Sequence, residues 1–297
     1  MFLPLVQRAA IVRAIREFFD ARGFIEVETP IRLRAPANEA HINAPPSGDA
    51  FLRASPELEM KRLLADGHPR IYQIGACFRE GEEGDRHHGE FTMLEWYRAH
   101  ADYDAILDDF CALVPHCATT LHGTLRWEYQ KTLLDLSLPP DVITVHEAYR
   151  RWAAWDPVAA YHAERFDMDM ALKIEPALPK DRLCILKDYP AGAAALSALH
   201  PGNPRLAQRW EGYLGGMELV NAFTELTDPA EQRARFEAAA AERRRMGNVP
   251  YPINEAFLAS LSRLPPSGGA ALGVDRLAML LLDIPRIRAI RVTDEGA

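Results

Sequence analysis

Phe91-Thr92-Met93-Leu94-Glu95-Trp96-Tyr97-Arg98 is an apolar run that carries a carboxylate, Glu95, near its middle. The pattern predicts a strand with Phe91, Met93 and Trp96 on one face and Glu95 on the other. A carboxylate in a buried strand costs several kcal/mol unless it meets a cation or several hydrogen-bond donors. We therefore expect Glu95 to contact a bound ligand.

A second apolar run lies just upstream and also predicts a strand. Ile71 to Phe78 ends at Arg79, and the polar, glycine-containing stretch from Glu80 to Gly89 separates it from the first run. Two strands joined by such a loop form an antiparallel hairpin, with Arg79 at one stem and Glu95 on the other. This arrangement suits a ligand that is anionic at one end and cationic at the other.

The hairpin resembles a known sequence motif. Phe78-Arg79, a charged loop and then His87 through Tyr97 are similar to motif 2 of the class II aminoacyl-tRNA synthetases, lysyl type. The similarity is closer to their short paralogues, the elongation factor P (R)-β-lysine ligases. The resemblance implies an α+β fold, in which helices flank an antiparallel sheet, and an ATP-dependent enzyme that forms AMP and pyrophosphate.

The N-terminal part agrees with that resemblance. Leu5 to Arg22 has the apolar period of an amphipathic helix, and Gly23 ends it. Phe24 to Ile31 alternates like a strand, with Pro30 at its end or edge. Helix, glycine, strand and proline resemble class II motif 1, which implies a homodimer interface.

Composition bounds the class of protein. The chain has 297 residues, 48% of them hydrophobic, and a formal net charge of -8, so no broad basic surface for nucleic acid is expected. The run Arg243 to Arg245 predicts only a solvated helix end. The four cysteines have no metal-binding or redox spacing. No apolar stretch reaches the ~20 residues of a membrane span, which predicts no membrane association and a cytoplasmic location.

The resemblance covers most of the chain. It predicts one catalytic domain over residues 1–297, without an anticodon-binding domain because motif 1 starts almost at Met1. Residues 126–182 match only in place and length a variable helical insertion of the family.

A helix start follows the first strand region. Ser55 is expected as the N-cap, Pro56 as the first helical residue, and Glu57 in the first turn. In the family this Ser-Pro-Glu turn also touches the amino acid, which makes Ser55 and Glu57 candidate substrate-binding residues, Glu57 on the amino group.

A second hairpin is predicted where Gly215-Gly216 joins two apolar runs. Glu211 and Glu218 flank the turn and can share a divalent cation, or can simply be exposed strand residues. The resemblance favours the first reading, because this spacing supplies the carboxylates for the Mg²⁺ of bound ATP.

The resemblance also assigns the remaining contacts. Glu225, with Glu95 and Tyr97, would bind a lysine side-chain ammonium, and Asn221 would contact the substrate. Residues 265–282 resemble motif 3, a strand followed by a helix with Arg276 at the junction. Arg79 and Arg276 would be the catalytic arginines, with adenine between Phe91 and Arg276, and the other ATP-binding positions would be Glu82, His88, Glu218, Leu219 and Gly273.

Two departures from the family pattern matter. Gly81 stands where motif 2 usually has Glu, and we hypothesise that this glycine lets the loop bulge so that Glu82 meets the adenine amino group. His88 stands where Asn is common. Ala271 replaces the glycine of lysyl-tRNA synthetases and matches the ligase paralogues, so it favours β-lysine over α-lysine.

The expected acceptor is a lysine of elongation factor P, and tRNA is not expected. A truncated lysyl-tRNA synthetase or general adenylate-forming enzyme is the first alternative. A catalytically silent paralogue that only binds an amino acid is the second.

Overall fold

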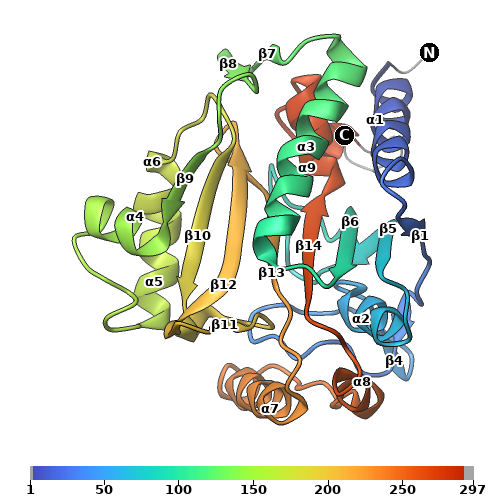
Figure 1. Ribbon diagram of the computed structural model, residues 1–297, viewed down its shortest axis with the longest axis vertical. Helices are drawn as coiled ribbons and strands as arrows, with labels where there is room; N and C mark the ends of the chain where they lie inside the picture. The colour runs from blue at the N-terminus through green and yellow to red at the C-terminus, as the bar shows by residue number, and fades with distance from the viewer. Residues whose placement is uncertain (1–2, 291–297) are drawn as a thin grey trace.

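Strand β6 (Glu90–Ala99) lies inside a nine-stranded sheet in a computed structural model that describes residues 3–290. The strand order is β1-β5-β6-β14-β13-β12-β10-β9, and β11 pairs with β12 (Figure 1). All pairings are antiparallel except β1 with β5 and β9 with β10. The expected α+β fold is confirmed. The strands are β1 (Ile25–Glu26), β5 (Arg70–Phe78), β9 (Asp141–Thr144), β10 (Cys184–Pro190), β11 (Leu199–His200), β12 (Asn203–Leu214), β13 (Met217–Thr224) and β14 (Ser267–Gly273).

One face of the sheet is covered by helices. α1 (Leu3–Asp20), α3 (Tyr103–His122), α9 (Val274–Leu282) and the short η3 (Ile287–Ile290) pack there (Figure 1). Their apolar side chains form the main core with inward residues of the sheet, among them Leu94 and Trp96. A small hairpin, β7 (Arg126–Tyr129) and β8 (Thr132–Asp135), is tied to α9, because the Trp127 indole donates to the Leu280 carbonyl over 2.9 Å.

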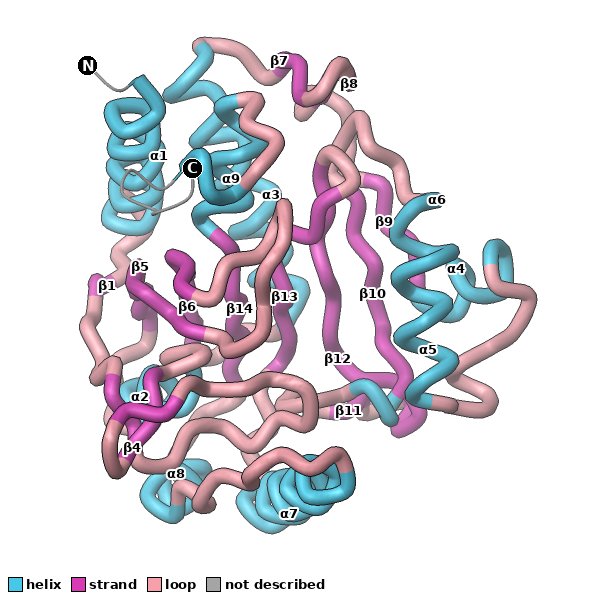
Figure 2. The backbone as a smooth tube through the Cα atoms, turned by 180° about the vertical axis from the view of Figure 1, so that it is seen from behind, coloured by secondary structure: helices cyan, strands magenta, loops and turns pink. Residues whose placement is uncertain are grey.

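The other face is covered only around its rim, and Figure 2 shows loops in front of the middle strands. α2 (Glu57–Ala65), α7 (Pro229–Arg245) and α8 (Glu255–Leu261) pack at one end beside a small sheet of β2 (Arg32–Leu33), β3 (Pro46–Ser47) and β4 (Ala50–Leu52). A separate apolar cluster on β10 and β12 holds the remaining elements, which are α4 (Val145–Trp152), α5 (Ala163–Asp169), η1 (Met170–Ile174), α6 (Glu175–Ala177) and η2 (Ala191–Ala193).

The faces of β6 differ from the sequence prediction at Trp96 and at Glu95. Trp96 is fully buried in the main core with Leu94, whereas Met93, Glu95 and Tyr97 face the opposite side of the sheet. Strict alternation of side chains along a strand explains this result, because Glu95 must share a face with Met93 rather than with Leu94. The prediction placed Trp96 on the same face as Met93 and placed Glu95 on the opposite face, and it was wrong for both Trp96 and Glu95.

The strand of motif 1 is shorter than expected, because only Ile25–Glu26 of the predicted 24–31 pair with β5. After Glu26, side chains take over the hydrogen bonds of the backbone at Thr29. The amide of Thr29 donates to the Gln73 side chain, and the buried Arg53 guanidinium donates to the Thr29 carbonyl. The segment 126–182, which matches a helical insertion of the family in place and length, also contains strands β7, β8 and β9 beside its helices.

The start of one helix shifts as well. α2 begins at Glu57 with Pro56 in the N-cap position, one residue later than predicted. Ser55 therefore precedes the N-cap. Its hydroxyl still accepts the Glu57 amide over 3.0 Å. The predicted domain of 1–297 includes residues 1–2 and 291–297, which lie outside the described residues. Within 3–290, no helix is both long enough and apolar enough to cross a membrane.

Candidate functional site

The open face of the sheet carries a cavity of about 330 Å³. Its lining comes from the loop after Arg79, from strands β6, β12, β13 and β14, and from α9. Almost every residue that the sequence singled out lines it, although these residues come from segments far apart in the chain. The predicted residues on its wall are Ser55, Glu57, Arg79, Glu82, His88, Phe91, Glu95, Tyr97, Glu211, Glu218, Leu219, Asn221, Ala271, Gly273 and Arg276. The exception is Glu225, which is buried behind this wall.

The register of the sheet places four of these residues in one row. Glu95 on β6 pairs with Ala271 on β14, Ala271 with Asn221 on β13, and Asn221 with Glu211 on β12. Residues directly opposite each other in antiparallel strands project on the same face. The row therefore runs across the floor of the cavity from the carboxylate of Glu95 to that of Glu211.

At one end of the cavity, the carboxylate of Glu95 accepts hydrogen bonds from two uncharged side chains. The Ser55 hydroxyl donates to one oxygen of Glu95 over 2.5 Å, and the Tyr97 hydroxyl donates to the other over 2.8 Å. Glu95 is only 1% exposed, and burial raises its pKa to about 7. Its two hydrogen bonds only partly offset that shift, so a cation in the cavity would complete its environment.

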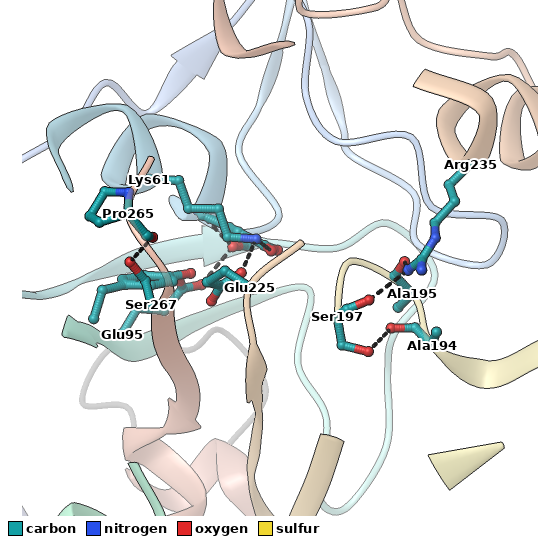
Figure 3. Close-up of polar contacts among 12 residues, drawn as sticks. Lys61, Glu95, Ala194, Ala195, Ser197, Glu225, Arg235, Pro265 and Ser267 are labelled. Atoms are coloured by element: carbon teal, nitrogen blue, oxygen red, sulfur yellow. Dashed lines mark hydrogen bonds and ion pairs between the residues drawn. The ribbon is translucent and has the colours of Figure 1, made fainter. Parts of the chain in front are cut away.

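A lysine of the protein lies beneath this carboxylate. Lys61 on α2 forms ion pairs with both Glu57 and Glu225, and its side chain is fully buried (Figure 3). Burial alone would lower the pKa of Lys61, but the two carboxylates outweigh it and raise that pKa to about 12. Lys61 is therefore an internal counter-ion, and Glu225, the predicted ammonium ligand, already has one cation of the chain as its partner.

Gly269 allows these groups to approach one another. A Cβ atom at Gly269 would lie 2.2 Å from the Tyr97 ring and 2.6 Å from the Glu225 carboxylate. Any larger side chain at this position would displace one of the two residues. The sequence did not single out Gly269, because a glycine in a strand carries no chemical signature of its own.

The other end of the cavity is rich in arginine. The Arg79 guanidinium lies 5.2 Å from the centre of the Phe91 ring and 3.6 Å from the Glu82 carboxylate. Gly81 has a φ of +82°, a conformation that residues other than glycine rarely adopt, so the turn at this position depends on glycine. The contact of Glu82 with adenine remains a prediction.

Arg276 connects three segments at this end. Its Nη1 donates to the Glu218 backbone carbonyl over 2.9 Å and to the Glu218 carboxylate over 3.0 Å. Its Nη2 lies 2.6 Å from Nε2 of His87, and Arg86 donates to the Gly216 carbonyl over 2.7 Å. The loop after Arg79 is thus held against the 215–216 turn, and His87, rather than only the predicted His88, faces the cavity.

Glu211 and Glu218 both line the cavity beside the hairpin turn. Glu211 accepts from Arg209 over 2.7 Å and from the Tyr213 hydroxyl over 2.6 Å. Burial raises the pKa of Glu211, Arg209 opposes the shift, and the charge of Glu218 adds to it. Two carboxylates suit Mg²⁺, which usually binds one or two of them and completes its shell with phosphates and water. Among residues 3–290 no group of three metal-binding side chains occurs.

Sequence reasoning missed several cavity residues. Glu39 lies in the 34–45 loop and Arg209 in β12, and neither belongs to a motif. The expectation of a solvated helix end at 243–245 is wrong for Arg243, which is 2% exposed. Its guanidinium donates to the carbonyls of Glu39 and Ile42 over 2.9 and 2.7 Å, so it holds the loop that carries Glu39.

The three motifs meet at the wall of the cavity. Arg8 of α1 donates to the Asp275 carboxylate over 2.9 Å and to the Thr92 hydroxyl over 2.7 Å. The Thr92 amide donates to the other Asp275 oxygen over 2.7 Å. One residue from each predicted motif therefore takes part in a single network, as expected if the motifs act together.

Comparisons with known proteins agree with this geometry. Residues 2–292 match the family described as tRNA synthetases class II (D, K and N). The chain is 40% identical to the elongation factor P–(R)-β-lysine ligase of Vibrio cholerae, over 94% of this chain and 91% of that protein. It is 39% identical to the ligase of the same name from Erwinia tasmaniensis, with 94% and 90% covered.

A lysine–tRNA ligase is also similar. The enzyme of Moorella thermoacetica is 37% identical over 96% of this chain, but the match spans only 63% of that protein. The family match and the relatives covered over most of their length lead to one conclusion. This chain belongs to the class II tRNA synthetase family of the aspartyl, lysyl and asparaginyl type.

Proposed function

We propose that this protein activates (R)-β-lysine or lysine with ATP and transfers the acyl group to a lysine side chain of elongation factor P. One observation carries the proposal: a single cavity has buried carboxylates at one end and arginines with two further carboxylates at the other. A site that binds both ATP and a dibasic amino acid needs carboxylates for the ammonium groups and cations for the phosphates. Several relatives named elongation factor P–(R)-β-lysine ligase support the same choice.

At the acidic end, Glu95 and Tyr97 receive the side-chain ammonium of the substrate. The Glu95 carboxylate is oriented by Ser55 and Tyr97. A site built to bind a cation rejects an uncharged analogue, because the analogue leaves the buried carboxylate without a partner. Glu225 acts with Lys61 to set the charge of this end, and Asn221 and Ala271 shape the floor between the two ends.

At the basic end, Arg79 neutralises charge that develops at the α-phosphate while Phe91 and Arg276 position the nucleotide. The substrate carboxylate attacks the α-phosphorus, the new O–P bond replaces the bond to pyrophosphate, and an aminoacyl adenylate forms. Positioning and electrostatic stabilisation account for this step, and it needs no protein nucleophile. The amine of an acceptor lysine then attacks the acyl carbon, loses a proton, and releases AMP.

Glu211 and Glu218 would hold Mg²⁺ at this end. Their carboxylates come from neighbouring strands and line the same wall, and the charge of Glu218 raises the pKa of Glu211. When bound, Mg²⁺ would neutralise phosphate oxygens of the nucleotide. Arg209 and Arg276, which now pair with the two carboxylates, would then be available to other anions.

The acceptor can be identified by a labelling experiment. The protein is incubated with labelled (R)-β-lysine, ATP, purified elongation factor P and tRNA, and both macromolecules are separated and counted. The proposal predicts label on elongation factor P that withstands mild base, since the bond is an amide. Label on tRNA alone would favour the lysine–tRNA ligase alternative that the Moorella thermoacetica relative represents. Absence of any lysine-dependent pyrophosphate exchange would favour the silent paralogue.

We further propose a homodimer that forms through motif 1. Four large apolar side chains of the motif 1 segment are exposed by 41 to 53%: Leu5, Val6, Ile25 and Ile31. Large apolar side chains that stay exposed along one segment suit an interface with a second chain. An Ile25→Glu variant should lower the mass measured by light scattering to that of one chain, whereas an unchanged mass of two chains would exclude this interface.

A further inference from the structure

Glu39 has no place in the motifs, yet it lines the cavity beside the acidic end. Ser55, Glu57, Ile42 and Glu39 line both the main cavity and a second, small cavity next to it, so these four residues form one shared wall. Within residues 3–290 no side-chain hydrogen bond or ion pair engages the Glu39 carboxylate, which is half-buried. A half-buried carboxylate without a protein partner is costly unless a ligand completes its environment.

The loop that carries Glu39 is firmly held. Arg243 donates to the Glu39 and Ile42 carbonyls and to the Asn43 side chain, over 2.7 to 2.9 Å. Asn38 and the backbone of Tyr251 exchange two hydrogen bonds of 3.0 Å each. These bonds fix the backbone on both sides of Glu39, so its carboxylate is positioned on the cavity wall rather than free to turn into solvent.

At the acidic end, one of the glutamates has no partner among the side chains of residues 3–290. Four glutamates contribute, and Lys61 already pairs with Glu57 and Glu225. Glu95 is the remaining carboxylate within the floor, with Ser55 and Tyr97 as donors. A dibasic amino acid carries two ammonium groups, so the second one needs a further carboxylate. Glu39 is the one that the structure leaves open to the cavity.

The surroundings of Glu39 indicate which ammonium it meets. The loop that carries Glu39 lies against the residue that follows Arg79, because the Glu80 amide donates to the Asn43 carbonyl over 2.8 Å. Glu39 therefore lies toward Arg79, where the substrate carboxylate meets the α-phosphate. In an amino acid, the backbone ammonium is the one next to that carboxylate. Burial raises the pKa of Glu39 to about 7, as expected for an unpaired acid in this position.

We infer that Glu39 binds the backbone ammonium of the substrate beside Glu57 and so selects amino acids over ω-amino acids that lack this group. The inference rests on the proposed function. It adds a specificity-determining residue that lies outside the three motifs and is held by Arg243 of α7.

The test compares lysine with 6-aminohexanoate, which keeps the terminal ammonium and the carboxylate but lacks the backbone ammonium. Affinities of both for the full-length protein are measured by titration calorimetry, for wild type, Glu39→Gln, Glu95→Gln and Glu28→Gln. Glu28 is an exposed glutamate outside the cavity and serves as the matched control. (R)-β-lysine is measured in parallel.

In Glu39→Gln the preference for lysine over 6-aminohexanoate should fall about tenfold or more, through weaker lysine binding alone. Glu95→Gln should weaken both ligands by similar factors, and Glu28→Gln should change neither. An unchanged preference in Glu39→Gln, or equal losses for both ligands, would overturn the inference. If wild type bound neither ligand and showed no lysine-dependent pyrophosphate exchange, the proposed function itself would fail.

Discussion

Lys61 and Glu225 form an ion pair in which both side chains are fully buried, and Glu57 is the second partner of the same ammonium. The pair joins α2 to the end of β13 directly under the acidic end of the cavity. A substrate ammonium therefore enters a site whose charge the protein has already partly balanced. The acidic end is therefore not a group of unpaired carboxylates, because Lys61 already neutralises part of their charge.

Lys61→Met should strongly destabilise the protein. Removing one partner of a buried ion pair leaves an uncompensated charge and costs about 3–5 kcal/mol. Chemical denaturation at neutral pH measures the loss, and Lys61→Met combined with Glu225→Gln should recover part of it. A loss below about 1 kcal/mol, the scale of an exposed pair, would show that Lys61 is not the counter-ion.

The same variant has a predictable pH dependence. Without Lys61, burial raises the folded-state pKa of Glu225 further above its unfolded value. A carboxyl with a raised folded pKa is least costly below its unfolded pKa and becomes costly as pH rises through the folded one. The destabilisation should therefore be smaller at about pH 5 than at about pH 8. The opposite order would contradict this assignment.

Lysine binding should strengthen as pH rises past neutrality. Burial raises the pKa of Glu95 to about 7, and only the ionised form attracts an ammonium. In the free protein this raised pKa makes stability decline as pH rises through about 7, while bound lysine offsets the cost. The lysine-induced increase in Tm should thus be larger at about pH 8 than at about pH 6, with norleucine as the uncharged control. An equal or smaller increase at the higher pH would be inconsistent with Glu95 as the ligand.

Glu218→Gln should raise the Mg²⁺ concentration needed for activity. The variant loses one of the two carboxylates proposed to hold the ion, and it weakens the 3.0 Å pair with Arg276. Pyrophosphate exchange measured over a range of Mg²⁺ concentrations gives the half-saturating value, which should increase about tenfold or more. Glu28→Gln is the control. A half-saturating value equal to that of wild type would remove Glu218 from the proposed metal site.

Ala271→Gly should shift selectivity toward α-lysine. Ala271 lies between Glu95 and Asn221 in the row across the floor, so its methyl group occupies space beside the substrate. One methyl group changes discrimination by about 1–3 kcal/mol, or roughly 10- to 200-fold. The ratio of kcat/KM for (R)-β-lysine to that for α-lysine measures the effect. A shift toward β-lysine would show that the methyl group acts in another way.

Much of the fold followed from local signals. The Gly215–Gly216 hairpin was readable from alternation and turn residues, as were the strands on either side of the loop after Arg79. The cavity residues followed from the motif resemblance, because each motif fixes several side chains at once. The faces of Trp96 and Glu95 were misjudged because the prediction did not apply strict alternation, which puts residues 93 and 96 on opposite sides of a regular strand.

The residues that sequence reasoning missed share a physical reason. Lys61 and Arg243 lie in helices where lysine and arginine are usually exposed, and only long-range packing makes them buried. Glu39 lies in a loop without periodicity, and its position depends on Arg243, 204 residues away in the chain. Contacts over such distances leave no local pattern in one sequence.

If one cavity brings ATP together with a dibasic amino acid, that amino acid must drive the exchange of labelled pyrophosphate into ATP. We expect exchange with lysine or (R)-β-lysine and none with norleucine, and a loss of about 100-fold or more in kcat/KM for the amino acid in Glu95→Gln with little change for ATP. Exchange that norleucine supports equally well, or that Glu95→Gln leaves unaffected, would show that the cavity does not bind its ligands in this way.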